Sequence, residues 1–231
     1  AALFYRGSNL KETEEGEKSV RNKSPYKFSD EVEKFKKAAL SIKDRYELFW
    51  FSIVQILVAF ALVMWNTYTP VYLIDKNGIG LTESEIWIFP FIFSLVMISI
   101  IVIFIPKIKE SDFKKYLIIG LALSIISAFL YVFAPFKKFS FLALSAILNG
   151  CWLAFFRPLS DAYSMNILSD AERARIISVF NTIIIVALIP AGQIAGELYV
   201  LYPRLTFLAV AVILAVSLLI IKLKFSYGES R

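Results

Sequence analysis

Six apolar stretches of about 20 residues each limit what this chain can fold into. A helix of that length covers about 30 Å, the thickness of the hydrocarbon core of a bilayer. A soluble domain instead mixes apolar and polar residues within each helix, because each helix buries only one face. Hydrophobic residues make up 58% of this chain and are concentrated in the six stretches. The sequence therefore predicts an all-α membrane protein with six transmembrane helices.

Short polar connections separate the predicted spans, so neighbouring helices are expected to run antiparallel. An even number of spans returns the chain to the side on which it started. Residues 49–231 form the predicted six-helix transmembrane domain. The expected spans are Phe49–Leu73, Ile86–Ile105, Tyr116–Phe133, Phe141–Ile167, Ile176–Tyr199 and Leu205–Leu223.

Basic residues are concentrated on one side of the predicted bundle. That side holds 21 of the 25 Lys and Arg residues, in the N-terminal segment, in two connections and at the C-terminus. Basic residues that flank spans stay in the cytoplasm. We therefore expect a multi-pass protein of the cell membrane with both termini cytoplasmic. The net charge of +6 then reflects topology, and no nucleic-acid partner is expected.

The polar segment 1–48 is expected to be a cytoplasmic linker. Gly, Ser, Asn, Lys and Glu dominate residues 7–24, a composition typical of flexible chain. Ser29 is a suitable N-cap for a short amphipathic helix, which either lies on the membrane surface or forms a solvated part of the linker. Ala1–Tyr5 is apolar and Arg6 follows it directly. This pattern indicates the end of a preceding membrane helix, with a processed terminus as the alternative.

Residue types that most catalytic and metal sites need are scarce. Histidine is absent, and Cys151 is the single cysteine. The sequence has no glycine-rich phosphate loop, no GxSxG motif and no HExxH motif. We therefore expect no enzymatic activity, no catalytic residue, no metal and no cofactor.

The first span carries a stripe of polar and small residues. Gln55, Ala59, Leu62 and Asn66 are spaced by four, three and four residues, so they share one helix face. Polar side chains are costly in lipid unless they find a partner or a wet cavity. The stripe either lines a cavity or packs against a neighbouring helix.

The fourth span carries a mixed polar and aromatic face. Asn149, Trp152 and Phe156 recur at helical spacing, which suits the binding of an amphipathic solute or ordinary helix packing. Arg157 and Asp161 follow, four residues apart, near the cytoplasmic end. They either pair with each other, or Arg157 extends to the interface.

The fifth span carries Gly192 and Gly196, spaced as in the GxxxG motif of closely approaching membrane helices. Glu197 follows near the outer end and is expected to reach water. Because no carboxylate lies clearly deep in a span, uniport, symport and antiport all remain open.

The segment 149–199 carries an ordered series of Gly, Pro, acidic, basic and amide residues. The series comprises Gly150, Pro158, Asp161, Asp170, Glu172, Arg173, Arg175, Asn181, Pro190, Gly192 and Gly196. It resembles the tenth and eleventh helices of the major facilitator superfamily and the loop between them. The resemblance implies that this chain is the C-terminal half of a twelve-helix carrier, with the central cytoplasmic loop. Its partners would be a small-molecule solute, the lipid bilayer and the missing N-terminal six-helix half.

The resemblance also implies how the polar faces work. Carriers of this superfamily rock one half against the other around a midplane site, and the seventh and tenth helices line the cavity. The expected solute contacts are Gln55, Asn66, Asn149, Trp152 and Phe156. The expected cytoplasmic gate consists of Arg157, Asp161, Asp170, Arg173 and Arg175, where charge pairs form in one state and break in the other.

Two hypotheses for function follow. In the first, the chain is a carrier half that moves a small organic solute by alternating access. In the second, it is a free-standing six-helix membrane protein, such as a membrane enzyme or a scaffold. The first predicts six further spans upstream of Ala1, and the second predicts a chain that acts alone.

Overall fold

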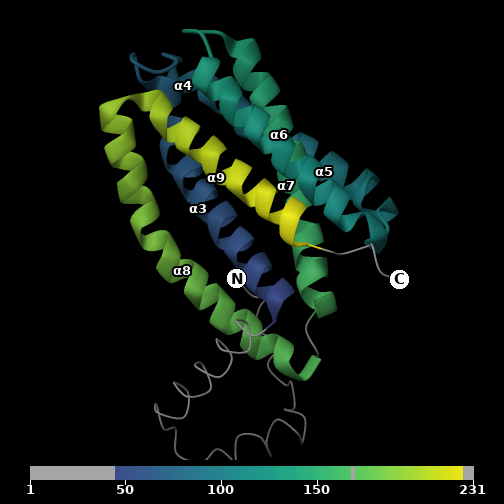
Figure 1. The fold of residues 1–231 in the computed structure, drawn as a ribbon. Helices are drawn as coiled ribbons and strands as arrows, with labels where there is room; N and C mark the ends of the chain where they lie inside the picture. Colours follow the sequence, from purple (N-terminus) through teal and green to yellow (C-terminus); the bar gives the residue numbers. More distant parts are fainter. Residues whose placement is uncertain (1–44, 168–169, 226–231) are drawn as a thin grey trace, which may run out of the picture. The chain divides into compact units, whose positions relative to one another are not determined.

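The computed structural model describes residues 45–167 and 170–225, with the side chains of 165–175 left out (Figure 1). The described part contains six helices that are long and apolar enough to cross a membrane, and it contains no strand. The predicted all-α membrane fold is therefore confirmed. The expected linker helix and the interpretation of Ala1–Tyr5 lie outside the described residues.

The observed helices agree with the predicted spans to within a few residues at most ends. A four-residue helix, α4 (Glu83–Ile86), precedes α5, and two 3-10 turns (Ile105–Lys107 and Glu110–Asp112) connect α5 to α6. The six long helices are α3 (Tyr46–Ile74), α5 (Ile88–Ile103), α6 (Phe113–Phe133), α7 (Phe139–Ile167), α8 (Asp170–Leu201) and α9 (Pro203–Lys224).

Local sequence signals account for several helix ends. The backbone N–H of Thr82 donates a hydrogen bond to the Glu85 carboxylate at 2.8 Å, which satisfies one of the free donors where α4 begins. Pro203 is the first residue of α9, a position where its missing N–H costs nothing. Lys222 and Lys224 lie in the last turn of α9, where positive charge complements the helix dipole.

In chain order the six long helices form two sets of three: α3, α5 and α6 form the first set, and α7, α8 and α9 form the second. α3 packs against α8 and α9, α7 packs against α5 and α6, and α6 packs against α9 between the sets (Figure 1). Exchanging α3 with α7, α5 with α8 and α6 with α9 maps these five pairings onto themselves, whereas the further contact between α8 and α9 has no counterpart of similar extent between α5 and α6. Because each set has three spans, an odd number, the chain enters the second set from the opposite side of the membrane to the first. The described domain is thus an inverted repeat in its helix pairing.

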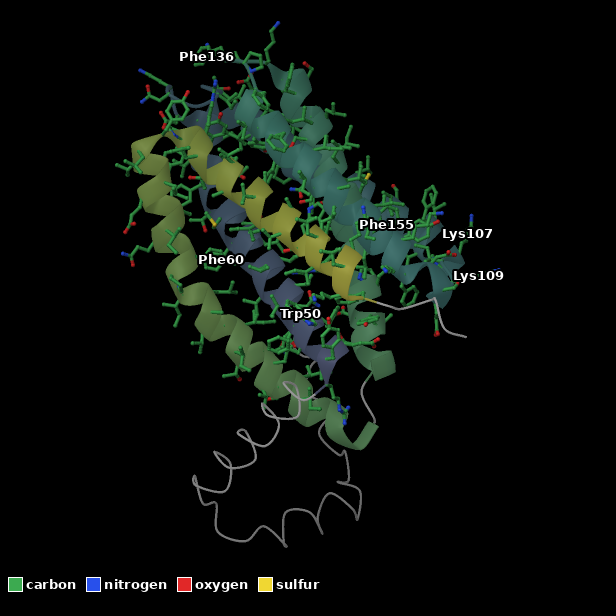
Figure 2. The ribbon with its side chains drawn as sticks, viewed as in Figure 1. Trp50, Phe60, Lys107, Lys109, Phe136 and Phe155 are labelled. Atoms are coloured by element: carbon green, nitrogen blue, oxygen red, sulfur yellow. The ribbon has the colours of Figure 1, made fainter. Side chains whose placement is uncertain are left out.

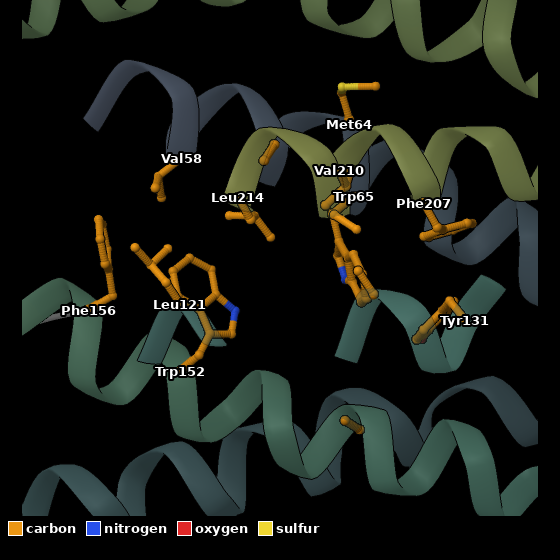
Figure 3. Packing of buried hydrophobic residues seen from close by; sticks show 14 of the residues in the cluster. Val58, Met64, Trp65, Leu121, Tyr131, Trp152, Phe156, Phe207, Val210 and Leu214 are labelled. Atoms are coloured by element: carbon orange, nitrogen blue, oxygen red, sulfur yellow. The ribbon is translucent and has the colours of Figure 1, made fainter. Parts of the chain in front are cut away.

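An aromatic cluster lies between α3, α6 and α9. The rings of Trp65 and Tyr131 are 4.7 Å apart between centroids, and those of Tyr131 and Phe207 are 4.9 Å apart (Figure 3). The hydroxyl of Tyr72 donates a hydrogen bond to the carbonyl of Tyr131 at 3.1 Å. Buried aromatic pairs in edge-on or offset geometry add to the stability that burial gives. The cluster therefore holds the first set against the second.

The connections after α3 and α6 meet at one end of the helices. The backbone N–H of Lys137 donates to the carbonyl of Ile79 at 3.0 Å. Gly80 has a φ of 72°, and a β-carbon there would lie 2.3 Å from the Phe136 ring. Only glycine fits that position without strain. Figure 2 shows Phe136 at this end, opposite to the end of α6 near Lys107.

Candidate functional site

α3 and α7 lie opposite each other, and at one end the rings of Phe51 and Tyr163 are in contact, with 4.9 Å between their centroids. In the described part of the chain the two helices make no extended helix contact, since each packs against other helices. Side chains from both helices instead line two cavities. We name these the α5 cavity and the α8 cavity after the third helix that closes each of them.

The α5 cavity has a volume of about 380 Å³. Its walls are mostly apolar, as in most small-molecule sites, with a few polar groups between them. The aromatic residues that line it are Trp65, Phe89, Phe93 and Tyr131. The polar residues that line it are Asn66, Thr69, Ser145, Asn149 and Arg157.

The α8 cavity has a volume of about 460 Å³ and lies nearer the other end of α3 and α7. Its lining includes charges of both signs. The polar residues that line it are Gln55, Arg157, Ser160, Asp161, Ser164 and Asn181.

Leu62 and Arg157 line both cavities, so the two cavities are neighbours at these side chains. The exchange that relates the two helix sets also relates the cavities. Under this exchange, the helices around the α5 cavity (α3, α5 and α7) become α7, α8 and α3, which are the helices around the α8 cavity. One cavity therefore lies towards each end of the same pair of facing helices.

The stripe predicted on the first span runs along both cavities. Gln55, Ala59 and Leu62 line the α8 cavity, and Leu62 and Asn66 line the α5 cavity. The next turn adds Thr69, whose hydroxyl donates to the Trp65 carbonyl at 2.7 Å. Helical spacing alone brings these residues onto one face.

Pro70 adds a backbone acceptor to the α5 cavity. It lies inside α3, which continues to Ile74. A proline has no N–H, so the carbonyl of Asn66 one turn earlier loses its usual helical donor. Asn66 and Pro70 both line the α5 cavity. A solute that carries a hydrogen-bond donor can satisfy this carbonyl.

Asn149 lines the α5 cavity, but Trp152 lines neither large cavity. Trp152 is 1% exposed and lies in the core beside Leu121 and Leu214 (Figure 3). Its indole N–H donates a hydrogen bond to the side-chain oxygen of Asn149. Trp152 therefore orients the Asn149 amide from behind and leaves its NH₂ group available to a solute.

Phe156 lines the α8 cavity, although it is only 3% exposed. Next to it on the cavity wall is Ser160, whose hydroxyl is buried and has no hydrogen-bond partner in the described part of the chain. A buried hydroxyl without a partner costs free energy. Ser160 is therefore a polar group of this cavity that sequence spacing did not distinguish from core packing.

Two of the expected gate residues line the cavities. Arg157 and Asp161 are both exposed, and no ion pair joins them within residues 45–167 and 170–225. The side chains of Asp170, Arg173 and Arg175 lie outside the described residues. The gate thus remains a prediction. The structure places Arg157 at the junction of the two cavities.

The α5 wall was missed by reasoning from sequence. Phe89, Pro90 and Phe93 line the α5 cavity within a helix that is apolar all round. Nothing in such a helix distinguishes a cavity wall from a lipid-facing surface. Gly150 was a possible signal in the sequence, because small residues mark helix crossings. A β-carbon on Gly150 would lie 2.8 Å from the Phe93 carbonyl oxygen.

The described residues contain no group of three or more His, Cys, Asp or Glu side chains that could hold a metal ion. The two cavities offer groups for binding a solute: apolar walls, amide and hydroxyl groups, the Arg157 guanidinium and the Asp161 carboxylate. Comparisons with known protein families, with curated proteins and with solved structures found no match to this chain.

Proposed function

We propose that this chain moves a small organic solute across a membrane by alternating access, as the C-terminal six-helix half of a carrier. The observation that carries the proposal is the pair of cavities between α3 and α7, one towards each end, which meet at Leu62 and Arg157. A solute site reachable from both sides must lie at such a junction within the span.

The inverted pairing of the helices supports the same function. Many secondary transporters are built from inverted repeats, with the solute site at the repeat interface near the midplane. Here the interface between the sets holds both cavities. The missing N-terminal half would cover the open side of α3 and α7, the bilayer would cover the rest, and both termini would be cytoplasmic in the cell membrane.

Asn149 provides a test by uptake. The whole protein that contains this chain is reconstituted in liposomes, and uptake is measured for labelled benzoate, leucine, glucose and choline. Asn149→Leu is expected to reduce uptake of the transported solute at least about tenfold. The reason is that polar groups of the solute would lose their hydrogen bonds to the Asn149 amide. Ser99→Leu is the matched control, because Ser99 is an exposed residue of α5 that lines neither cavity.

Size-exclusion chromatography and circular dichroism show whether each variant is folded. Folded Asn149→Leu protein with unchanged uptake would contradict the proposed site. If the wild-type protein takes up none of these solutes, and cysteines placed at Asn66 and Asn181 in a Cys151→Ala background react from one side only, alternating access is rejected.

A further inference from the structure

Arg157 carries its charge inside the part of α7 suited to crossing a membrane, seven residues or roughly 10 Å from the Ser164 end of that part. It is the nineteenth residue of α7, so it lies roughly 27 Å along the helix axis from Phe139 and roughly 15 Å from Ile167. The part of α7 suited to crossing a membrane is 139–164. Ionisable residues at such depth are costly in lipid and usually face a partner or a functional cavity.

Arg157 has no carboxylate partner in the described part of the chain. Asp161 lies one turn further along α7 but forms no ion pair with it. Asp161 lines only the α8 cavity, whereas Arg157 also lines the α5 cavity. The α8 cavity thus contains one charge of each sign, and the α5 cavity contains a single positive charge.

The rest of the α5 cavity fits an apolar body. Phe89, Phe93 and Trp65 form its aromatic wall, and no acidic residue lines it. The amide of Asn149, fixed by the Trp152 indole, directs its NH₂ donors into this space. A guanidinium with amide donors nearby suits a carboxylate, which it can bind through two parallel hydrogen bonds.

We propose that the solute is a monovalent organic carboxylate, held by Arg157 at its anionic end with its apolar body in the α5 cavity. A doubly charged phosphate is less suited, because the cavity has one cation. This inference rests on the proposed function and adds the chemical class of the solute. It gives Arg157 a role in binding, beside or in place of the role in gating expected from the sequence.

The test compares two probes that differ only in charge. Binding of 4-phenylbutyrate and of its neutral amide, 4-phenylbutyramide, to the whole purified protein is followed by tryptophan fluorescence, since Trp65 lines the cavity. The carboxylate is expected to bind at least about tenfold more tightly than the amide, the effect of one charge-assisted interaction. Arg157→Gln is expected to abolish this preference, and Arg157→Lys to retain part of it.

Lys138→Gln is the control, because it removes one positive charge from an exposed residue that lines neither cavity. It is expected to retain the preference for the carboxylate. Equal binding of the two probes, binding of neither, or an unchanged preference in folded Arg157→Gln would each overturn the inference.

The binding test of this inference and the uptake test of the proposed function can fail independently. A carboxylate that binds through Arg157 but is never transported in liposomes leaves the inference standing and removes the carrier function. Transport of neutral solutes without any preference for carboxylates leaves the carrier function standing and removes the inference.

Discussion

The hydroxyl of Tyr199 donates a hydrogen bond to the carboxylate of Asp75, with 2.8 Å between the two oxygens. The contact joins the end of α8 to the connection that follows α3. The ring of Tyr199 also packs against Tyr68 of α3, with 5.1 Å between the ring centroids. The two helices are thus held together at this end by one polar contact and one aromatic contact.

Removing the Tyr199 hydroxyl should loosen that end. Tyr199→Phe keeps the ring packing but loses the hydrogen bond to a carboxylate, so we expect a loss of about 1–2 kcal/mol in unfolding free energy. Thermal unfolding in detergent measures the change. Tyr202→Phe is the control, because Tyr202 is exposed and its hydroxyl bonds to no other described residue. An equal loss in both variants would contradict a specific role for the contact with Asp75.

Gly150 lies at a close approach of α7 to α5. A β-carbon on Gly150 would lie 2.8 Å from the carbonyl oxygen of Phe93, and backbone cannot rotate away as a side-chain end can. Gly150→Ala should therefore push the two helices apart and cost about 1–3 kcal/mol.

Gly192→Ala is the matched control, since a β-carbon there meets nothing within 4 Å. It should leave stability unchanged or raise it by up to about 1 kcal/mol, because alanine favours helix over glycine. Denaturation in mixed micelles compares the two variants. A harmless Gly150→Ala would mean that α5 can shift freely on α7.

Ser127 and Ser145 form a buried polar contact between α6 and α7. Their hydroxyl oxygens are 2.7 Å apart, and the hydroxyl of each lies 3.0 Å from the backbone carbonyl of the other. Each single change to alanine should cost about 0.6–1.7 kcal/mol, the range found for polar contacts between membrane helices. The double change should cost less than the sum, which a double-mutant cycle measures. Strict additivity would show that the hydroxyls act independently.

The predicted orientation can be tested with the single native cysteine removed. In a Cys151→Ala background, Lys138→Cys should react with an impermeant maleimide added to intact cells, and Lys109→Cys should react only after the cells are opened. The reason is that basic residues concentrate on the Lys109 side, which is expected to be cytoplasmic. The reverse pattern of labelling would invert the proposed topology.

The spans could be predicted from sequence because each span depends only on the composition of its own consecutive residues. A helix in lipid must be apolar over about 20 residues, and that is visible in any window of the chain. The shared face of Gln55 and Asn66 on α3 could also be predicted from their spacing, but the spacing left open whether that face lines a cavity or packs against a neighbouring helix. Both signals depend only on residues close together in the chain.

The cavity walls depend on how helices meet, and that could not be read from spacing. Trp152 and Asn149 share a helical face in the sequence, yet the structure buries one and leaves the other on a cavity. The difference arises because α6 packs against α7 at Trp152, where a β-carbon on Gly120 would lie 3.3 Å from the Trp152 carbonyl oxygen. Phe93 carried no polar signal at all, and its place on the wall is set by the approach of α5 to Gly150.

The inverted pairing of the two sets has a consequence for how the chain enters the membrane. The connection into the third helix of the first set carries Lys107 and Lys109, and Lys114 and Lys115 follow in α6. The corresponding turn of the second set carries Arg204 alone. By the rule that basic residues stay in the cytoplasm, these corresponding connections predict opposite orientations for the two sets. Changing these few basic residues would alter this orientation signal while leaving the helix faces, and so the packing, unchanged.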